Sequence, residues 1–317
     1  MGSEVTRRTF VKGTLLASAG AAMALGSGAT AAPAAEPDKP AAAPEAAKNT
    51  LPKGKIKDLQ ISRLLLGGNL LTHFTHSRDL QYVYNLAKHY NTTEKILQTM
   101  AIAEANGINT VVLQGITPVL KEYREKRGGK IQCIYGPCPP VDDGLVKWGQ
   151  AVQEVIDAGV DAVYFWGVHA DALVAQKKID VIGKAVDMAK AHGVPSGLAA
   201  HNLDVIVECE KAKIGADFYI KTLHHHNYPS AKLDFDSMWC TNPEETIAFM
   251  KTVEKPWIAF KVMAAGAIPP ADAFRYVYVG GADFILAGMF DFEIAEDAQI
   301  ARQILAGLPK RTRPWRG

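Results

Sequence analysis

Histidines that recur at the ends of apolar, β-rich runs are the first candidates for chemistry in this sequence. His169, His201 and His224 follow three successive runs of this kind, and Asp291 follows the last run. Imidazole and carboxylate groups are ligands that suit Zn²⁺, Mn²⁺ or Fe²⁺. We therefore predict a divalent metal ion bound by these four side chains. The alternative is that the histidines bond loop backbone groups or contact a polar substrate directly.

Two lysines inside apolar runs are the second set of candidates. Lys221 lies in FYIKT and Lys261 lies in IAFKV. Burial of a lysine disfavours its charged form, so its pKa falls and its amine can act as a base or a nucleophile. We expect Lys221 and Lys261, together with His169, to take part in catalysis. The alternative is that the two lysines bind acidic partners or substrate oxygens.

A larger set of polar and aromatic residues lies next to the same runs and is expected to contact a substrate. The segment 69–90 follows the first run, is rich in histidine and tyrosine, and has the features of a lid over a binding site. The predicted substrate contacts are Asn69, His73, His76, Gln114, Tyr135, Trp166, His225 and His226.

The elements that must position these residues are eight short β-rich runs that alternate with amphipathic stretches. The runs are apolar throughout, which is typical of parallel strands covered on both faces. This alternation predicts a (β/α)₈ TIM barrel, in which chemistry takes place at the carboxyl ends of the strands. A doubly wound open sheet is the structural alternative. The expected strands are Arg63–Gly67, Thr110–Leu113, Lys130–Tyr135, Ala162–Trp166, Ser196–Ala200, Phe218–Thr222, Trp257–Val262 and Phe284–Ala287.

The N-terminal segment differs in composition from the rest of the chain. Residues 6–12 read TRRTFVK, an apolar stretch follows, and residues 29–31 read ATA, an expected cleavage site. The segment resembles a twin-arginine export signal, which implies the export machinery as a partner and a periplasmic or extracellular location. The apolar stretch is too short for a stable membrane anchor, the alternative interpretation. The expected division is a signal peptide over 1–31, a flexible linker over 32–55, the barrel over 56–310 and a tail over 311–317.

Charge and cysteine content exclude two classes of protein. The chain has 35 basic and 33 acidic residues, and without residues 1–31 its formal charge is zero. A neutral body has no basic field for a phosphate backbone, so nucleic acid is not an expected partner. Four cysteines are too few for a disulfide scaffold. Whether Cys138 and Cys240 form a disulfide is left open.

Several segments resemble the aldo-keto reductase superfamily. They read IKDLQISRLLLGGN, EKILQTMAIAEANGINTVVL, DAVYFWGVHAD and VPSGLAAHNLDVIVECEKA, and the resemblance continues through the last two expected strands. It implies that fold, an NAD(P) cofactor, and His169 as counterpart of a catalytic histidine. Reductases of that family use a catalytic tetrad of Asp, Tyr, Lys and His. Three of the four are missing from this sequence: Leu113 and Gln114 occupy the region of the Asp, no Tyr follows at the expected short distance, and the segment IQCIYGP lacks the Lys. We therefore expect the scaffold without the hydride transfer.

A second, shorter resemblance concerns the two lysines. GADFYIKT and IAFKVMAAGAIPPADA resemble the two-lysine arrangement of class I aldolases of the deoxyribose-phosphate type. The resemblance implies that Lys221 forms a Schiff base and that Lys261 perturbs it. The phosphate-binding Gly-Gly turn of those enzymes is replaced by Ala265-Gly266-Ala267.

These observations favour an exported TIM-barrel enzyme that acts on a small molecule. The main hypothesis is a metal-assisted lyase, isomerase or hydrolase whose substrate is a carbohydrate or a related polyhydroxylated compound. Three alternatives stay open: an NAD(P)-dependent oxidoreductase of the aldo-keto reductase type, a Schiff-base aldolase using Lys221, and a barrel that binds a ligand without catalysis.

Overall fold

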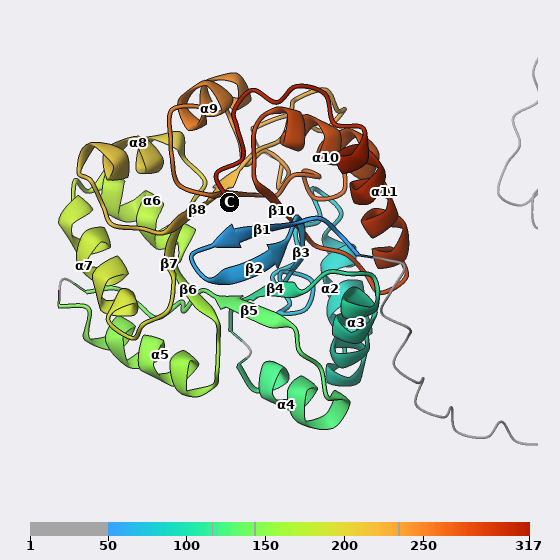
Figure 1. The fold of residues 1–317 in the computed structure, drawn as a ribbon, viewed down its shortest axis with the longest axis horizontal. Helices are drawn as coiled ribbons and strands as arrows, with labels where there is room; N and C mark the ends of the chain where they lie inside the picture. Colours follow the sequence, from blue (N-terminus) through green and yellow to red (C-terminus); the bar gives the residue numbers. More distant parts are fainter. Residues whose placement is uncertain (1–49, 116, 143, 234) are drawn as a thin grey trace, which may run out of the picture. The chain divides into compact units, whose positions relative to one another are not determined.

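The computed structural model describes residues 50–317 apart from 116, 143 and 234, so the expected signal peptide and most of the linker lie outside the described residues. In the described part, eight parallel strands close into a barrel in the order β10-β3-β4-β5-β6-β7-β8-β9 (Figure 1). The predicted (β/α)₈ TIM barrel is confirmed. The barrel strands are β3 (Leu64–Gly67), β4 (Thr110–Leu113), β5 (Gln132–Tyr135), β6 (Ala162–Phe165), β7 (Ser196–Ala200), β8 (Phe218–Thr222), β9 (Trp257–Phe260) and β10 (Phe284–Ala287).

Helices surround the barrel and connect its strands (Figure 1). Local sequence explains several of their starts: the Thr92 side chain caps the α3 helix by accepting a hydrogen bond from the backbone N–H of Lys95, and Pro243 opens α9. No helix in the described part is long and apolar enough to cross a membrane. The helices are α2 (Gln81–Tyr90), α3 (Thr93–Ala105), α4 (Thr117–Arg127), α5 (Val146–Asp157), α6 (Gly167–Ala175), α7 (Ile179–Lys190), α8 (Leu203–Lys211), α9 (Pro243–Met250), α10 (Pro270–Val279) and α11 (Ile294–Ala306).

Both ends of the barrel domain differ from the expected boundaries. An antiparallel hairpin of β1 (Lys53–Ile56) and β2 (Leu59–Ser62) precedes the barrel, so ordered structure begins inside the expected linker. Its Ile56 and Ile61 pack into the barrel interior. The expected tail is also part of the fold, because buried Arg313 makes a 3.0 Å ion pair with Asp283.

Each strand residue faces one of two apolar layers, the barrel interior or the layer between the barrel and the helices. Side chains alternate across a strand, so neighbouring residues face opposite sides. On β8, Phe218 and Ile220 belong to the interior cluster, whereas Tyr219 packs in the layer between barrel and helices. On β9, Ile258 faces the interior and Ala259 faces the helices. This alternation decides which lysine can reach the centre of the barrel.

Candidate active site

A cavity of about 890 Å³ opens among the carboxyl ends of the barrel strands and the loops that follow them. Its walls are mostly apolar and include the aromatic side chains of Tyr164, Trp166, Trp239 and Phe260. Glycine lets the floor pack closely: a Cβ on Gly68 would lie 2.1 Å from a backbone oxygen of the neighbouring strand β4. A large, mostly apolar cavity with a few polar groups at this end of a TIM barrel is the expected place for an active site.

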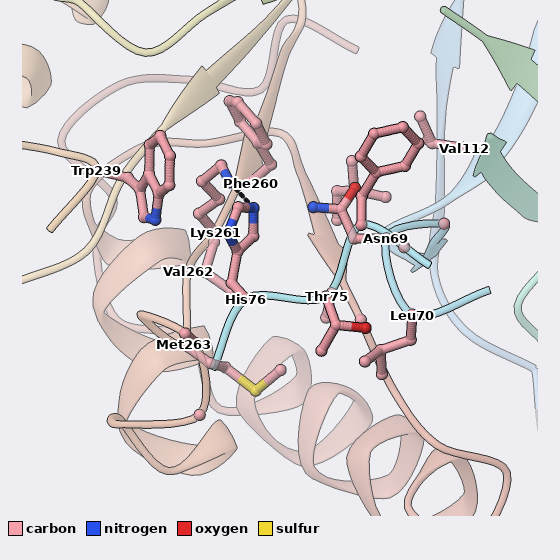
Figure 2. A pocket seen from close by; sticks show the side chains of 18 of the residues that line it. Asn69, Leu70, Thr75, His76, Val112, Trp239, Phe260, Lys261, Val262 and Met263 are labelled. Carbon is pink, nitrogen blue, oxygen red and sulfur yellow. Dashed lines mark hydrogen bonds between the residues drawn. The ribbon is translucent and has the colours of Figure 1, made fainter. Parts of the chain in front are cut away.

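Lys261 lies in the wall of this cavity directly after β9. Its backbone adopts a left-handed conformation with φ of 56°, which is uncommon for a long side chain. The ammonium group bonds to Nε2 of His76 and lies 3.8 Å from the centre of the Trp239 ring (Figure 2). Burial lowers the pKa of Lys261 to about 7, although the nearby charge of Asp236 acts in the opposite direction. The free amine is therefore accessible to Lys261 at a much lower pH than for an ordinary lysine.

His76 and Asp236 form a hydrogen-bonded pair behind Lys261. His76 Nδ1 lies 2.8 Å from Asp236 Oδ1, and the Ser77 backbone N–H donates to the other carboxylate oxygen at 3.3 Å. Burial is the largest single effect and raises the pKa of Asp236, but the hydrogen bond and charge of His76, the Ser77 N–H and the Lys261 charge together outweigh it, so the pKa is lowered. Because the carboxylate accepts a hydrogen bond from Nδ1–H, we assign the free lone pair of His76 to Nε2, which faces the Lys261 ammonium.

A second histidine–carboxylate pair stands on the same wall. His201 Nδ1 lies 2.7 Å from Asp171 Oδ2, and its ring packs 5.1 Å from the Trp239 ring and 5.4 Å from the Phe260 ring. Burial lowers the pKa of His201, the hydrogen bond to Asp171 opposes this, and the Lys261 charge lowers the pKa further. The site thus holds a neutral imidazole near the amine.

About half of the residues predicted from the sequence line this cavity. Asn69 and Gln114 also bond to each other, with Gln114 Nε2 donating to Asn69 Oδ1 at 2.6 Å. The predicted residues in the lining are Asn69, His73, His76, Gln114, Trp166, His201 and Lys261.

The predicted metal ligands do not converge. His224 Nε2 accepts hydrogen bonds from two backbone N–H groups at 3.1 and 2.9 Å, and its Nδ1 lies 3.1 Å from the His225 carbonyl oxygen. Asp291 instead accepts from Tyr90 Oη at 2.7 Å and pairs with Lys95 at 3.0 Å, which fastens α2 to the loop after β10. Among the described residues no group of three or more His, Cys, Asp or Glu side chains is arranged to hold an ion. The donor set therefore does not fit the predicted metal.

The remaining predicted residues lie outside the cavity lining. His169 packs 5.0 Å from the Trp166 ring, and buried Tyr135 closes β5. His225 lies 3.2 Å from Asp272 on α10, and His226 Nε2 donates to the Cys240 carbonyl at 2.7 Å. The open question of a disulfide is also answered, because Cys138 and Cys240 are free thiols.

Lys221 does not reach the cavity either. It stands on β8 next to inward-facing Ile220, so its side chain starts toward the helix layer. Only 1% of it is exposed, and its ammonium donates to the carbonyl and hydroxyl oxygens of Thr222 at 3.0 and 2.7 Å. Burial lowers its pKa to about 8. The sequence correctly suggests a buried lysine with a lowered pKa at this position. The alternation of side chains along β8, however, directs Lys221 away from the cavity.

Three carboxylates of the site were not predicted. Asp171 and Asp236 orient the two histidines, and Asp297 on α11 lines the cavity. Burial raises the pKa of Asp297 to about 7, with the nearby charges of Glu293 and Glu296 acting in the same direction. The sequence places Asp171 shortly after the fourth strand but gives it no role, whereas Asp297 lies on a helix and Asp236 lies far along the loop after β8, so a scan for strand-end residues misses these two.

Comparisons with known proteins support the fold. No protein-family model matches the chain, and no curated protein matches it. A structure from Pseudomonas aeruginosa, provisionally assigned as an aldo-keto reductase, is 16% identical with a TM-score of 0.56, covering 81% of this chain and 98% of that one. Phospho-2-dehydro-3-deoxyheptonate aldolase from Thermotoga maritima is 11% identical with a TM-score of 0.51, covering 83% and 76%. Identities this low show only a shared TIM-barrel fold. This shared fold agrees with the scaffold that the sequence resemblance implies.

Proposed function

We propose that this protein is a Schiff-base enzyme that acts on an aldehyde or ketone through the amine of Lys261. The observation that carries the proposal is the environment of that amine: inside a large cavity, with a pKa of about 7 and in contact with the acceptor nitrogen of His76. A neutral lysine amine is a nucleophile toward carbonyl carbon, whereas a fully charged one is not.

The covalent step follows from this arrangement. The Lys261 lone pair attacks the carbonyl carbon, a C–N bond forms, and the C=O π electrons move to oxygen, which takes a proton from solvent. His76 accepts the proton that leaves nitrogen, with Asp236 stabilising the resulting imidazolium. The His76 imidazolium then returns its proton to the hydroxyl group, and loss of water gives an iminium ion, which withdraws electrons and weakens the C–H or C–C bond at the neighbouring carbon. His201, the second neutral imidazole on this wall, is suited to take or return the proton there.

This proposal keeps the lyase chemistry of the main hypothesis but assigns the electrophilic role to an iminium instead of a metal. It also assigns the Schiff base to Lys261 instead of Lys221. A carbohydrate-like substrate stays a prediction, which the aromatic walls and the Asn69–Gln114 pair support. Metal analysis of the purified protein and the absorbance spectrum of any dinucleotide released on denaturation test the two cofactor predictions.

Reductive trapping tests the proposal. The protein is incubated with glycolaldehyde and sodium borohydride, and the modified peptide is mapped by mass spectrometry. Lys261 should carry the reduced adduct, Lys261→Met should lose it, and the matched variant Lys221→Met should retain it. Adducts confined to exposed lysines would overturn the proposal. Measurable binding of the aldehyde without any adduct would instead favour a non-catalytic binding barrel.

Export is proposed separately, on the N-terminal sequence alone. The twin-arginine pattern supports periplasmic delivery of the folded enzyme, with the export machinery as partner. Replacing both Arg7 and Arg8 by lysine should retain the protein in the cytoplasmic fraction. Unchanged periplasmic delivery of this variant would count against the assignment.

A further inference from the structure

Several polar atoms of residues that line the cavity have no hydrogen-bond partner in the part of the chain that the structure describes. Buried side-chain atoms without a hydrogen bond include His73 Nδ1, Thr75 Oγ1, Arg78 Nε and Trp239 Nε1, and all four residues line the cavity. Leaving buried donors unpaired costs free energy, so such atoms are rare, and one that belongs to a cavity wall can be paired by a ligand, an ion or a water molecule. Three of the four belong to the short segment 73–78 that follows β3.

Arg78 and Trp239 restrict the chemistry of a bound ligand most, because both can only donate hydrogen bonds. A guanidinium and an indole N–H donate hydrogen bonds and do not accept them, so their complement must be an acceptor. Arg78 also carries a positive charge, and within the described residues it has no ion pair or hydrogen bond. Its backbone φ of 58° lies in the left-handed region, a strained conformation that tends to occur at functional sites.

The Trp239 ring and the segment that leads into Arg78 lie close to the proposed nucleophile. The Trp239 ring is 3.8 Å from Lys261 Nζ. Arg78 directly follows Ser77, whose N–H binds Asp236, and His76 before it binds Lys261. Asp236 accepts hydrogen bonds from His76 and Ser77, and among the described residues no ion pair joins Arg78 to a carboxylate. Figure 2 shows Trp239, Lys261 and His76 together, with Asn69 across from them.

We propose that Arg78 and the Trp239 N–H form an oxyanion subsite beside Lys261, so that the substrate is an acidic carbonyl compound bearing a carboxylate or a phosphate. The carbonyl part of this inference rests on the proposed function, whereas anion recognition does not. Arg78 suits either anion because its planar guanidinium matches both carboxylate and phosphate oxygens. Thr75 and His73 complete the polar wall, since each can donate or accept.

Matched pairs of neutral and anionic probes test the subsite. Pyruvate is compared with pyruvamide, and glyceraldehyde 3-phosphate with glyceraldehyde, in borohydride trapping at Lys261 at pH 8. At least one anionic probe should label at least ~10-fold faster than its neutral partner, as expected for a charge-assisted contact. The pair with the larger ratio identifies carboxylate or phosphate. Arg78→Gln should remove the preference, and Lys88→Gln, which removes an equal charge from exposed α2, should retain it.

A binding assay separates this proposal from the proposed function. Calorimetric titration of Lys261→Met with the same probes measures anion recognition without a Schiff base. Preferential binding of an anionic probe that depends on Arg78, without any adduct on wild-type Lys261, would support the subsite and overturn the Schiff-base function. Equal labelling and equal binding of both members of each pair, or a preference that survives Arg78→Gln, would overturn the subsite.

Discussion

A lysine stands at the end of β8 and another directly after β9, yet the first is buried and the second is half-buried. Lys221 remains within its strand, is 1% exposed and donates to Thr222. Lys261 comes one residue after its strand has ended and faces a cavity and His76. Both pKa values are lowered by burial, to about 8 and about 7. A perturbed pKa therefore identifies a desolvated lysine but not a reactive one.

The physical difference is the backbone at the end of β9. Ile258 faces the barrel interior and Ala259 faces the helices, so a continued strand would direct residue 261 outward, as it does Lys221. The strand instead ends at Phe260, and the left-handed turn at Lys261 brings its side chain to the cavity. Such strain persists where the surrounding structure stabilises it, as the contacts with His76 and Trp239 do here.

The largest expected contrast is in amine reactivity. In competitive acetylation of the native protein across pH 5–10, Lys261 should react with a midpoint near pH 7 and Lys221 more than ~100-fold more slowly, since reaching Lys221 requires local opening. Mass spectrometry of each lysine peptide gives both rates, and fully unfolded protein supplies the reference. Comparable rates in the native state would remove the distinction between the two strand ends.

Two histidine–aspartate pairs offer a similar contrast. His76 pairs with Asp236 beside Lys261, whereas His225 pairs with Asp272 outside the cavity. His76→Ala should slow trapping at Lys261 by roughly 100-fold at pH 7, because the proton acceptor is lost. His225→Ala should change the rate less than about two-fold, as expected for a residue outside the site. The trapping rate with glycolaldehyde measures both, and an equal loss in the two variants would argue against a specific role for His76.

The positive charge of buried Lys221 should destabilise the folded state. Its pKa is about 8 when folded and 10.5 when unfolded, so between these values the unfolded chain binds more protons and stability rises with pH. The difference corresponds to roughly 3 kcal/mol. Urea unfolding at pH 7 and pH 10.5 should show this rise in the wild type and a rise smaller by that amount in Lys221→Met. An identical pH dependence in both proteins would contradict the assigned pKa shift.

The smallest expected effect concerns the charge of Asp236. This carboxylate raises the pKa of Lys261, so Asp236→Asn should move the rising limb of the trapping rate to lower pH. Asp272→Asn, which removes the same charge outside the cavity, is the matched control and should leave the midpoint in place. A midpoint that moves to higher pH would show that Asp236 does not act on Lys261 through its charge.

Fold and site were predictable to different degrees. All eight barrel strands were expected close to their observed bounds, because parallel strands buried on both faces are apolar runs that the sequence displays directly. The hairpin of β1 and β2 was missed because KGKI and LQIS are short and partly polar. For the site, Lys261, His76 and His201 were among the predicted residues. Their partners Asp236 and Asp171 were not, since loops and helices bring them in from positions without periodicity.

The amino-acid sequence by itself determined the barrel and the group of strands whose ends meet around the cavity. Local burial patterns and capping residues are short-range properties, so they can be recognised along the chain. Only the tertiary structure decided which perturbed lysine is accessible, which histidines contact a carboxylate and which bond to backbone. Those choices depend on which side of its strand a residue faces and on the left-handed backbone of Lys261. They also depend on contact between His76 and Asp236, which lie in loops 160 positions apart in the sequence. A side chain's direction, more than its type, therefore determines the chemistry open to it.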